Sequence, residues 1–441
     1  MITELTSENL SQVRNLELRQ YAAIYTRIYS GFMAQIAELG LDVDPIDPEP
    51  EAAAIRARLG QAGAISRNDD KSVYVNAISP ACVACQTGVG SATFFVSLEC
   101  HRQCFYCFNP NQEDYDHYRS HTRDVVAELR EIHAGGTRVA HLALTGGEPL
   151  LHKEEALQFY AYAREAFPSA HKRLYTCGDL VDEAILGRLR DAGLDEIRFS
   201  IRMHDSERMR ERILERIALA KQFIPSVMVE MPVLPGTLER MKLILRRLDQ
   251  IGIASINLLE LCFPLINADV FQRKGFKLKP RPYRTLYNYW YAGGLPISRS
   301  EVECLQLVEF AREQKLAMGV HYCSLENKHT GQIYQQNAGQ ALPRTAYFSS
   351  KDYFLKSAKV FGADARRAAR LLQRAGDTSH QFNREYNYLE FHVSRIPDLA
   401  PLNVEVGISS SVMESRGGGM VVRELKVDLT TPKRFTLATD V

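Results

Sequence analysis

The stretch "ATFFVSLECHRQCFYC", residues 92–107, joins a short apolar run to three cysteines. The run at 92–98 is rich in aromatic and β-branched residues, and such a composition predicts a buried strand. Cys100, Cys104 and Cys107 follow it directly, with three and then two residues between them. The chemistry of this loop therefore depends on what the rest of the chain builds around it.

The run at 92–98 is the first of six similar segments, each followed by a stretch long enough for a helix. Alternating strands and helices predict βα units, a parallel sheet and right-handed crossovers. The strands read as near-continuous apolar runs, as expected when both faces of a sheet are buried. The pattern predicts an α/β fold, either a partial (β/α)6 barrel or an open doubly wound sheet. The other five segments are "RVAHLALTGGEP" (138–149), "KRLYTC" (172–177), "DEIRFSIR" (195–202), "PSVMVEMPVLPG" (225–236) and "ASINLLELC" (254–262).

Polar residues recur near the carboxyl ends of these strands. Because barrel enzymes build their active sites from that edge, we expect the chemistry to lie there. The residues concerned, besides the cysteine loop, are Glu148, Thr176, Ser200, Arg202, Glu230, Asn257 and Glu260.

Composition limits the classes of function. The chain has 441 residues and a formal net charge of +1, so no basic field favours nucleic acid or an anionic membrane. The first residues are charged and no apolar run approaches the length of a membrane span, so we expect a cytoplasmic protein without a signal peptide. Nine cysteines in such a chain favour metal or redox chemistry over structural disulfides.

The two ends of the chain differ from the central pattern. Apolar residues at helical spacing predict a long helix over 7–39, capped by Ser7, and a second helix over 49–60. The segment 358–376 reads as a basic helix, and three later stretches read as antiparallel strands with a glycine turn at 417–419. We expect a helical N-terminal extension (1–80), a core (81–345) and a C-terminal α+β region for peptide or partner docking (346–441).

Three cysteines suit an iron–sulfur cube better than a zinc ion. A structural zinc site normally has four protein ligands. A [4Fe–4S] cluster held by three cysteines leaves one iron open to another ligand. The second predicted strand ends in "TGGEP" (145–149), and this pairing of CxxxCxxC and GGE on consecutive strands resembles the radical S-adenosylmethionine superfamily.

The resemblance covers residues 92–260 and implies a partial (β/α)6 barrel, a [4Fe–4S] cluster and S-adenosylmethionine. It implies that the three cysteines hold the cluster and that Gly146 and Gly147 let the backbone approach the methionine moiety. Glu148 would then pair with the methionine ammonium. The remaining implied cofactor contacts are Tyr106 with the adenine, and Ser200 and Arg202 with the ribose hydroxyls and the carboxylate. No catalytic residue is implied beyond these.

Other cysteines of the chain raise the question of a second metal site. "CVAC" (82–85) supplies two ligands, which is half a metal site. Cys323 would complete an auxiliary iron–sulfur or zinc site, and Cys304 and His321 are alternatives to it. Two buried or reducible thiols are the competing interpretation.

Three further residues carry simpler interpretations. Cys177 and Cys262 read as small core thiols, and Asp205 reads as a helix cap.

Stretches outside the core resemble the radical maturases of nif11-class ribosomal peptides, a group that includes the tyramine-excising spliceases. Those stretches are residues 79–98, "NLLELCFPL" and "VHYCSLENKHTGQIY". This resemblance implies that a precursor peptide is modified, with a lyase-like excision leaving an α-keto-β-amino amide. The implied partners are that peptide, a small accessory or leader-binding protein, and an electron donor such as flavodoxin or ferredoxin.

Alternatives to this function stay open. A glycyl-radical activating enzyme and a small-molecule radical mutase or methyltransferase would share the core. A cluster scaffold or zinc protein without catalysis would leave Glu148 and Arg202 without a role.

The tail suggests where a peptide would bind. "YNYLEFHV" and "VVRELKVDL" alternate polar and apolar residues, so an exposed edge there could accept a leader peptide as an added strand. Arg366, Arg367, Arg370 and Arg374 on the basic helix would suit an acidic leader or partner. The alternative is that the tail and helix merely cover the open side of the barrel.

Overall fold

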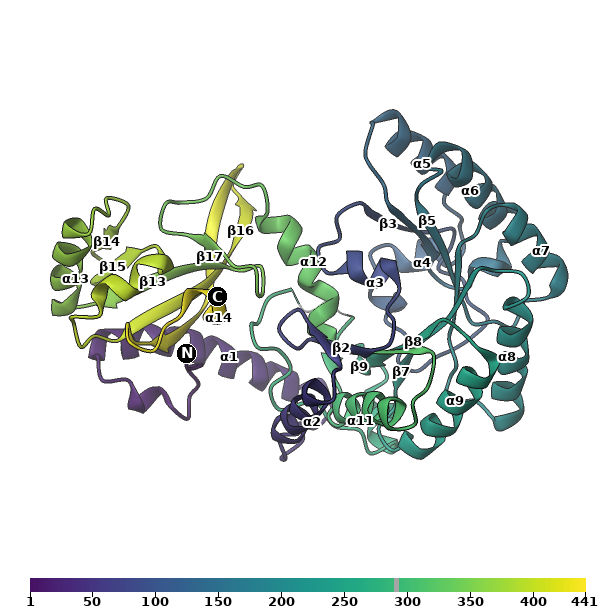
Figure 1. Ribbon diagram of the computed structural model, residues 1–441, viewed down its shortest axis with the longest axis horizontal. Helices are drawn as coiled ribbons and strands as arrows, with labels where there is room; N and C mark the ends of the chain where they lie inside the picture. The colour runs from purple at the N-terminus through teal and green to yellow at the C-terminus, as the bar shows by residue number, and fades with distance from the viewer. Residues whose placement is uncertain (289–292) are drawn as a thin grey trace. The chain divides into compact units, whose positions relative to one another are not determined.

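The computed structural model describes residues 1–288 and 293–441, and this chain divides into two compact units (Figure 1). The core unit contains residues 40–282 and 293–329 of the described chain. The terminal unit contains residues 1–39, 283–288 and 330–441. The expected extension at 1–80 is therefore divided, because its first helix groups with the C-terminal strands and its second with the core.

The core unit is built on a sheet that has nine strands within the described chain, in the order β1-β2-β11-β8-β7-β6-β5-β4-β3. The strands β3 to β8 are consecutive, parallel neighbours, which confirms the partial (β/α)6 barrel. These strands are β3 (Ser91–Phe95), β4 (His141–Thr145), β5 (His171–Thr176), β6 (Glu196–Phe199), β7 (Ser226–Val233) and β8 (Ser255–Glu260).

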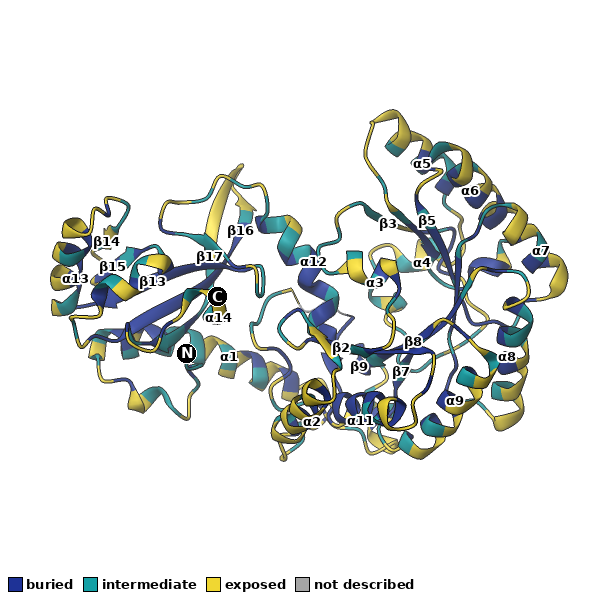
Figure 2. Cartoon of the chain, in the orientation of Figure 1, coloured by how far each residue is buried: buried dark blue, intermediate teal, exposed yellow. Residues whose placement is uncertain are grey.

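Helices follow these strands and cover the outside of the sheet, with their outward faces exposed (Figure 2). The helices of the core unit are α2 (Glu49–Gln61), α3 (Pro80–Cys85), α4 (Tyr115–Tyr118), α5 (Val125–Ala134), α6 (Lys153–Ala166), α7 (Glu183–Asp191), α8 (Glu207–Ala220), α9 (Leu238–Ile251), α10 (Ala268–Arg273) and α11 (Ser300–Glu313). Short 3₁₀ helices occur at Asn109–Asn111 and Pro149–Leu151. A separate two-stranded ladder joins β9 (Cys262–Phe263) to β10 (Leu295–Pro296).

Three strands extend the sheet beyond β8. β11 (Gly319–Cys323) lies parallel to β8, and β2 (Ser72–Val75) and β1 (Ile65–Arg67) follow as an antiparallel hairpin. The hairpin falls in a segment expected to be helical. Its turn residues, 68–70, all adopt positive φ, and such short strands on a tight Asn-Asp turn carry little periodicity for a sequence to reveal.

The expectation of strands apolar on both faces is wrong for the barrel interior. Successive side chains of a strand point to opposite faces, and on several strands one of the two sets is polar. β5 and β6 illustrate this: Arg173 and Glu196 are paired in register, and both are buried. Glu196 accepts from Ser79 Oγ at 2.8 Å and from Arg198 Nε at 2.6 Å, and Arg173 Nε donates to Tyr175 Oη at 3.3 Å.

The terminal unit is built on an antiparallel sheet in the order β14-β15-β13-β16-β17, with β12 also pairing with β13. Its strands confirm the antiparallel tail, and the turn between β16 and β17 contains Gly417 and Gly418 at positive φ. The strands are β12 (Tyr347–Phe348), β13 (Leu355–Phe361), β14 (Gln381–Asn383), β15 (Tyr388–Phe391), β16 (Val406–Arg416) and β17 (Gly419–Thr430).

Helices pack on both faces of the terminal sheet. Leu18 and Tyr21 of α1 (Leu16–Ala37) pack with Phe361 and Val427. α13 (Ala363–Arg374) packs on residues of β13 and β15 in a second apolar cluster. The remaining helices are α14 (Leu437–Asp440), the 3₁₀ helices Leu10–Gln12 and Val393–Leu399, and α12 (Leu325–Asn337), whose residues from Thr330 onward group with this unit.

Two sequence predictions for these helices need correction. The long N-terminal helix starts at Leu16 and is capped by Asn15, whose side chain accepts from Leu18 N; Ser7 is not its cap. The expected helix over 358–376 begins only at Ala363, because the first residues of that segment form the end of the fully buried strand β13.

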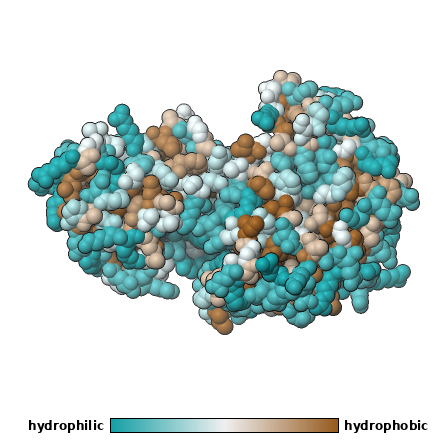
Figure 3. Space-filling view, in the orientation of Figure 1, coloured by the Kyte–Doolittle hydropathy of each residue, from teal (hydrophilic) through white to brown (hydrophobic). Residues whose placement is uncertain are grey.

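None of the helices in the described chain is long and apolar enough to cross a membrane. Figure 3 shows that hydrophobic surface in this view occurs as separate patches among hydrophilic side chains.

Candidate functional site

The cysteine loop begins shortly after β3, at the carboxyl end of the parallel sheet. All nine cysteines lie in the described chain, and none forms a disulfide. Burial raises the pKa of Cys100 and Cys107, and raises that of Cys104 to about 11. These thiols therefore keep their protons at neutral pH unless a metal cation replaces them.

The GGE loop is tied to the residues just before the cysteines. Gly147 N donates to Ser97 O at 3.1 Å, and Glu148 N donates to Glu99 O at 2.8 Å. From the other side of the cysteine loop, Asn109 Nδ2 donates to Gly146 O at 2.7 Å. The two motifs predicted from the sequence thus lie together.

Both glycines are required by this packing. A Cβ at Gly147 would lie 1.8 Å from Glu99 O, and Gly146 has φ +112° with Phe95 Cβ 2.5 Å from its Cβ position. Their role beside the methionine moiety stays a prediction, because the atoms that lie close to both glycines in this structure belong to the protein's own chain.

Glu148 is 1% exposed and joins the ends of β4 and β5. Its Oε1 accepts from Thr176 Oγ1 (2.9 Å) and Leu150 N (3.1 Å), and its Oε2 accepts from Cys177 N (2.7 Å). A carboxylate offers about four acceptor positions, so these bonds within the described chain leave one for an ammonium group. The ammonium role of Glu148 stays a prediction.

Arg202 lies at the end of β6 and is 3% exposed. Its Nε donates to Asp205 Oδ2 at 3.0 Å, and its terminal nitrogen lies 3.5 Å from Asp179 Oδ2. Asp205 is therefore an ion-pair partner of Arg202 and not the helix cap that we expected. The N-cap of α8 is Ser206, whose side chain accepts from Met209 N. Any ligand carboxylate must share Arg202 with these two acids.

Asp179 is a central acid of the site that the sequence did not reveal. Arg102, within the cysteine loop, binds it through two nitrogens, and Nε donates at 2.6 Å. Burial would raise the pKa of Asp179, but the hydrogen bonds it accepts, first of all from Arg102, hold this pKa well below its usual range. The cysteine loop is thus held to the ends of β5 and β6 by charge.

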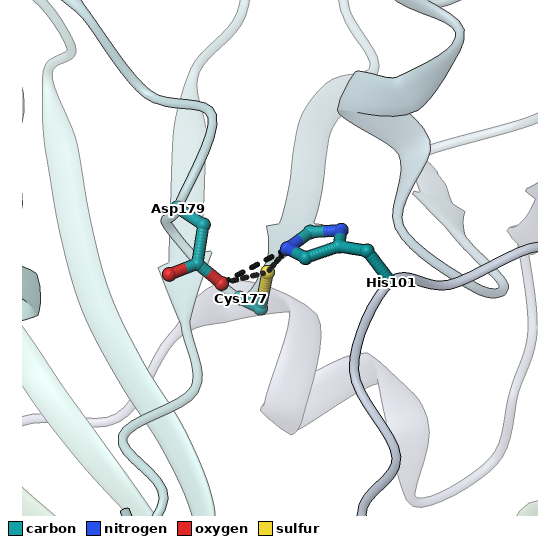
Figure 4. Close-up of side chains that lie close together, drawn as sticks. All are labelled: His101, Cys177 and Asp179. Atoms are coloured by element: carbon teal, nitrogen blue, oxygen red, sulfur yellow. Dashed lines mark hydrogen bonds and ion pairs between the residues drawn. The ribbon is translucent and has the colours of Figure 1, made fainter. Parts of the chain in front are cut away.

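His101, Cys177 and Asp179 converge at one point (Figure 4). His101 Nε2 and Cys177 Sγ lie 3.0 and 3.1 Å from Asp179 Oδ2, and 3.6 Å from each other. Within the described chain this is the one group of three potential ligands whose atoms all lie within 4.8 Å.

Electrostatics nevertheless disfavour a metal ion at this point. Asp179 is already ion-paired with Arg102 and Arg202, and these two positive charges would repel a metal cation. Burial, followed by the charge of Glu148, raises the pKa of Cys177, so this residue stays a neutral thiol. Cys177 is buried as expected, but it belongs to the site and not only to the core.

Tyr106 and Ser200 are half-buried beside this network. The Tyr106 ring lies edge-on to Phe105 and His204, with ring centroids 4.9 and 5.5 Å apart. Ser200 N donates to Thr176 O at 3.1 Å. Their contacts with adenine and ribose stay predictions.

A second polar network covers the inner face of the sheet beneath α3. At its centre Arg198 is 3% exposed, and it donates to Glu196 Oε1 and Glu230 Oε2, each at 2.6 Å. Glu230 Oε2 also accepts from Asn257 Nδ2 at 2.7 Å. Glu230, one of the polar residues expected near the strand ends, is thus an acid partner of Arg198.

Of the expected ligands of a second metal site, Cys82 and Cys323 lie on this inner face, and His321 is excluded. His321 uses both ring nitrogens, with Asn257 Oδ1 (2.9 Å) and Ser72 Oγ (2.7 Å). Cys304 is fully buried in α11, with its thiol 3.7 Å from Leu259 O. Cys262 is buried, as expected for a core thiol.

Comparison with known proteins identifies the central part of the chain. Residues 95–248 match the model of the Radical SAM superfamily. A putative glycyl-radical enzyme activating enzyme of Methanocaldococcus jannaschii is 27% identical over 210 residues, covering 45% of this chain and 54% of that protein. The chain thus spans about half the length of that curated relative.

Solved structures give weaker likenesses. Streptococcus suis SuiB bound to its precursor peptide SuiA has a TM-score of 0.38 at 12% identity, covering 76% of this chain and 68% of that one. The enzyme anSMEcpe with bound AdoMet and a peptide has a TM-score of 0.32 at 18% identity, covering 40% and 51%.

The parallel sheet, the cysteine loop tied to the GGE turn and the family match together define a radical SAM domain. The match implies a [4Fe–4S] cluster and S-adenosylmethionine as the cofactors of this domain.

The donor set fits the cluster. Three thiols without disulfide partners occur in one loop, and although burial raises the pKa of Cys104, the positive charge of Arg202 opposes that rise and favours the thiolate form that a metal binds.

Proposed function

We propose that this radical SAM enzyme modifies a ribosomally made precursor peptide. In its finer form the proposal is excision of a tyramine unit, leaving an α-keto-β-amino amide. When bound, the cluster and S-adenosylmethionine supply a 5′-deoxyadenosyl radical able to abstract hydrogen from an unactivated C–H bond. The residues of this chain contribute by anchoring, orienting and excluding water.

The observation that supports a peptide substrate is the edge of the terminal sheet. β17 is twelve residues long and is the last strand in the sheet order. Within the described chain its outer edge is bridged at Leu429 by Thr3, near its end. Met420, Val421 and Val422, at the other end of β17, are 47, 39 and 43% exposed.

An edge strand with exposed apolar side chains is a template for another strand. Natural proteins normally protect such an edge with charges, proline or a covering loop, unless it binds something. An extended leader peptide would gain main-chain hydrogen bonds there with little demand on its sequence. We therefore assign the leader to the residue 419–427 edge of β17.

The arginines of α13 are a separate feature. Arg366, Arg370 and Arg374 recur at helical spacing and are exposed. α13 packs against β13 and β15, so these arginines do not line the edge of β17. We assign them to an acidic face of the accessory protein.

The test uses the full chain and a synthetic precursor peptide encoded beside its gene. Met420→Lys/Val422→Lys places two charges on the edge, and Leu243→Lys, at a 63% exposed position of α9, is the matched control. We expect the edge variant to bind the peptide at least about 10-fold more weakly, while its peptide-independent cleavage of S-adenosylmethionine is unchanged. Equal peptide affinity in both variants would refute the assignment.

Glycyl-radical activation is the second candidate, favoured by the curated relative. It predicts a stable glycyl radical signal on a protein partner and no change in the mass of any peptide. Mass spectrometry of the precursor after turnover separates the two functions.

A further inference from the structure

Cys82 of α3 faces the inner side of the barrel sheet. Cys82 Sγ accepts from Asn257 Nδ2 of β8 at 3.1 Å, and Arg198 of β6 approaches it at 3.6 Å. The helix is held in place at its start, where Ser79 Oγ donates to Glu196 Oε2 at 2.8 Å. Two strands and a helix cap thus fix the position of Cys82.

Cys323 lies on the same face. β11 pairs with β8 so that His321 is level with Asn257 and Cys323 with Leu259. The hydrogen bond of His321 Nδ1 to Asn257 Oδ1 places His321 on the inner face, and residues two apart on a strand share a face. Cys323 is therefore one inward position beyond His321, on the strand beside the one that holds Cys82.

Cys85 is the second thiol of α3 and ends that helix. It lies three residues after Cys82, and residues three apart on a helix are neighbours on its surface. Cys82 and Cys85 therefore form one pair of thiols.

The sulfurs receive hydrogen bonds that neutral thiols seldom attract. A thiol sulfur is a weak acceptor. Besides the contacts to Cys82, Asn327 Nδ2 donates to Cys323 Sγ at 3.2 Å. Side-chain N–H groups directed at sulfur are typical of metal-bound thiolates, whose charge and potential they tune.

The spacing favours a cluster over a single ion. One zinc ion bonded to three thiolates at about 2.3 Å would hold the sulfurs about 3.8 Å apart. Within the described chain these three thiols do not form a group whose ligand atoms all lie within 4.8 Å, and neither do Cys100, Cys104 and Cys107. In both groups at least one pair of sulfurs is therefore farther apart than a single zinc ion would hold it.

We propose that Cys82, Cys85 and Cys323 ligate a second iron–sulfur cluster on the inner face of the barrel sheet. It is distinct from the cluster of the cysteine loop and does not depend on the substrate proposed above. Arg198, Asn257 and Asn327 direct N–H groups at Cys82 and Cys323, while Glu196 and Glu230 share the charge of Arg198.

Iron and acid-labile sulfide counting on anaerobically reconstituted protein tests the site. Cys82→Ser/Cys85→Ser/Cys323→Ser should lose about half of the iron and sulfide, as should Cys100→Ala/Cys104→Ala/Cys107→Ala. The combination of all six substitutions should lose both. Cys304→Ser and Cys262→Ser, at buried thiols outside both groups, are the matched controls and should keep the full content.

A spectroscopic measurement covers the case in which a triple variant folds poorly. Cys85→Ser alone changes an exposed residue, and it should alter one of two iron signals in Mössbauer and EPR spectra and leave the other intact. Full iron content in a natively folded Cys82/Cys85/Cys323 variant would overturn the proposal. So would zinc in place of iron in the loop-cysteine variant.

Discussion

The two cysteine groups of the core unit are brought together in different ways. Cys100, Cys104 and Cys107 occupy eight consecutive residues of one loop. Cys82 and its hydrogen-bond donor Asn257 are 175 residues apart, and Cys323 comes from a third element. The first group is set by local sequence, whereas the second exists only after the sheet has formed.

The surroundings of the two groups differ accordingly. Cys100 Sγ accepts a backbone N–H, from Arg102 at 3.4 Å, and the loop is anchored through Arg102 and Asp179. The inner group lies against side chains of three strands, with Arg198 at the centre. We therefore expect changes near the loop to affect cofactor chemistry, and changes on the inner face to affect folding as well.

The largest expected effect is on the loop group. Cys100→Ala/Cys104→Ala/Cys107→Ala should abolish formation of 5′-deoxyadenosine, because the cluster that cleaves S-adenosylmethionine loses its ligands. The assay is anaerobic turnover with dithionite and chromatography of the nucleoside. Cleavage at the wild-type rate would show that the inner group, and not the loop, carries this chemistry.

Arg198→Met tests the inner network. It leaves the buried carboxylate of Glu196 and the half-buried carboxylate of Glu230 without their cation, which should lower the free energy of unfolding by about 3–5 kcal/mol. Urea unfolding of the metal-free protein measures this, with exposed Arg240→Met as the control. A loss below about 1 kcal/mol would mean that the network is not needed for folding.

Glu260, at the end of β8, makes the stability of the inner region depend on pH. Burial raises its pKa to about 7, since the nearby Lys279 (3.9 Å) is shared with Glu301 and the charge of Glu326 adds to the repulsion. Between pH 4.5 and 7 the folded state then keeps a proton that the unfolded state has lost. The free energy of unfolding should therefore fall as pH rises through this range.

The expected fall is on the order of 3 kcal/mol, and Glu260→Gln should remove it. Unfolding curves at pH 5 and pH 8 provide the measurement. Parallel pH profiles for the two proteins would contradict the prediction.

The smallest expected effect concerns the cofactor pocket. Glu148→Gln keeps the shape of a fully buried side chain but removes its charge, so the Kd for S-adenosylmethionine should rise about 10- to 100-fold, equivalent to roughly 1.5–3 kcal/mol. Arg202→Met should act similarly. Binding to reconstituted protein decides this, and unchanged affinity in both variants would place the cofactor elsewhere.

The sequence was sufficient for the parts of the molecule that depend on local periodicity. All six parallel strands and the pairing of the cysteine loop with the GGE turn were predicted, because strand composition and motif spacing are local properties. The hairpin at 65–75 and the strand before α13 were missed, since short strands acquire their identity from their neighbours.

The site was predictable only where a motif marked it. Asp179 carries no signal until the fold brings Arg102 beside it, and Asp205 resembles a helix cap because Ser206, the actual cap, is its neighbour. The inner network could not be predicted from the sequence either. In "EIRF" the charged residues alternate with apolar ones, and this pattern normally indicates a strand face exposed to solvent, whereas Arg198 is buried.

The pairing of Thr3 with Leu429 also has a consequence for synthesis. The helix α1 leaves the ribosome long before Phe361 and Val427, which cover its apolar side and are made hundreds of residues later. At about 5–20 residues per second, we expect Leu18 and Tyr21 to wait roughly 20–80 s for their partners. During this interval the core unit can complete its sheet, while the first helix is a natural client for chaperones that shield apolar segments of nascent chains.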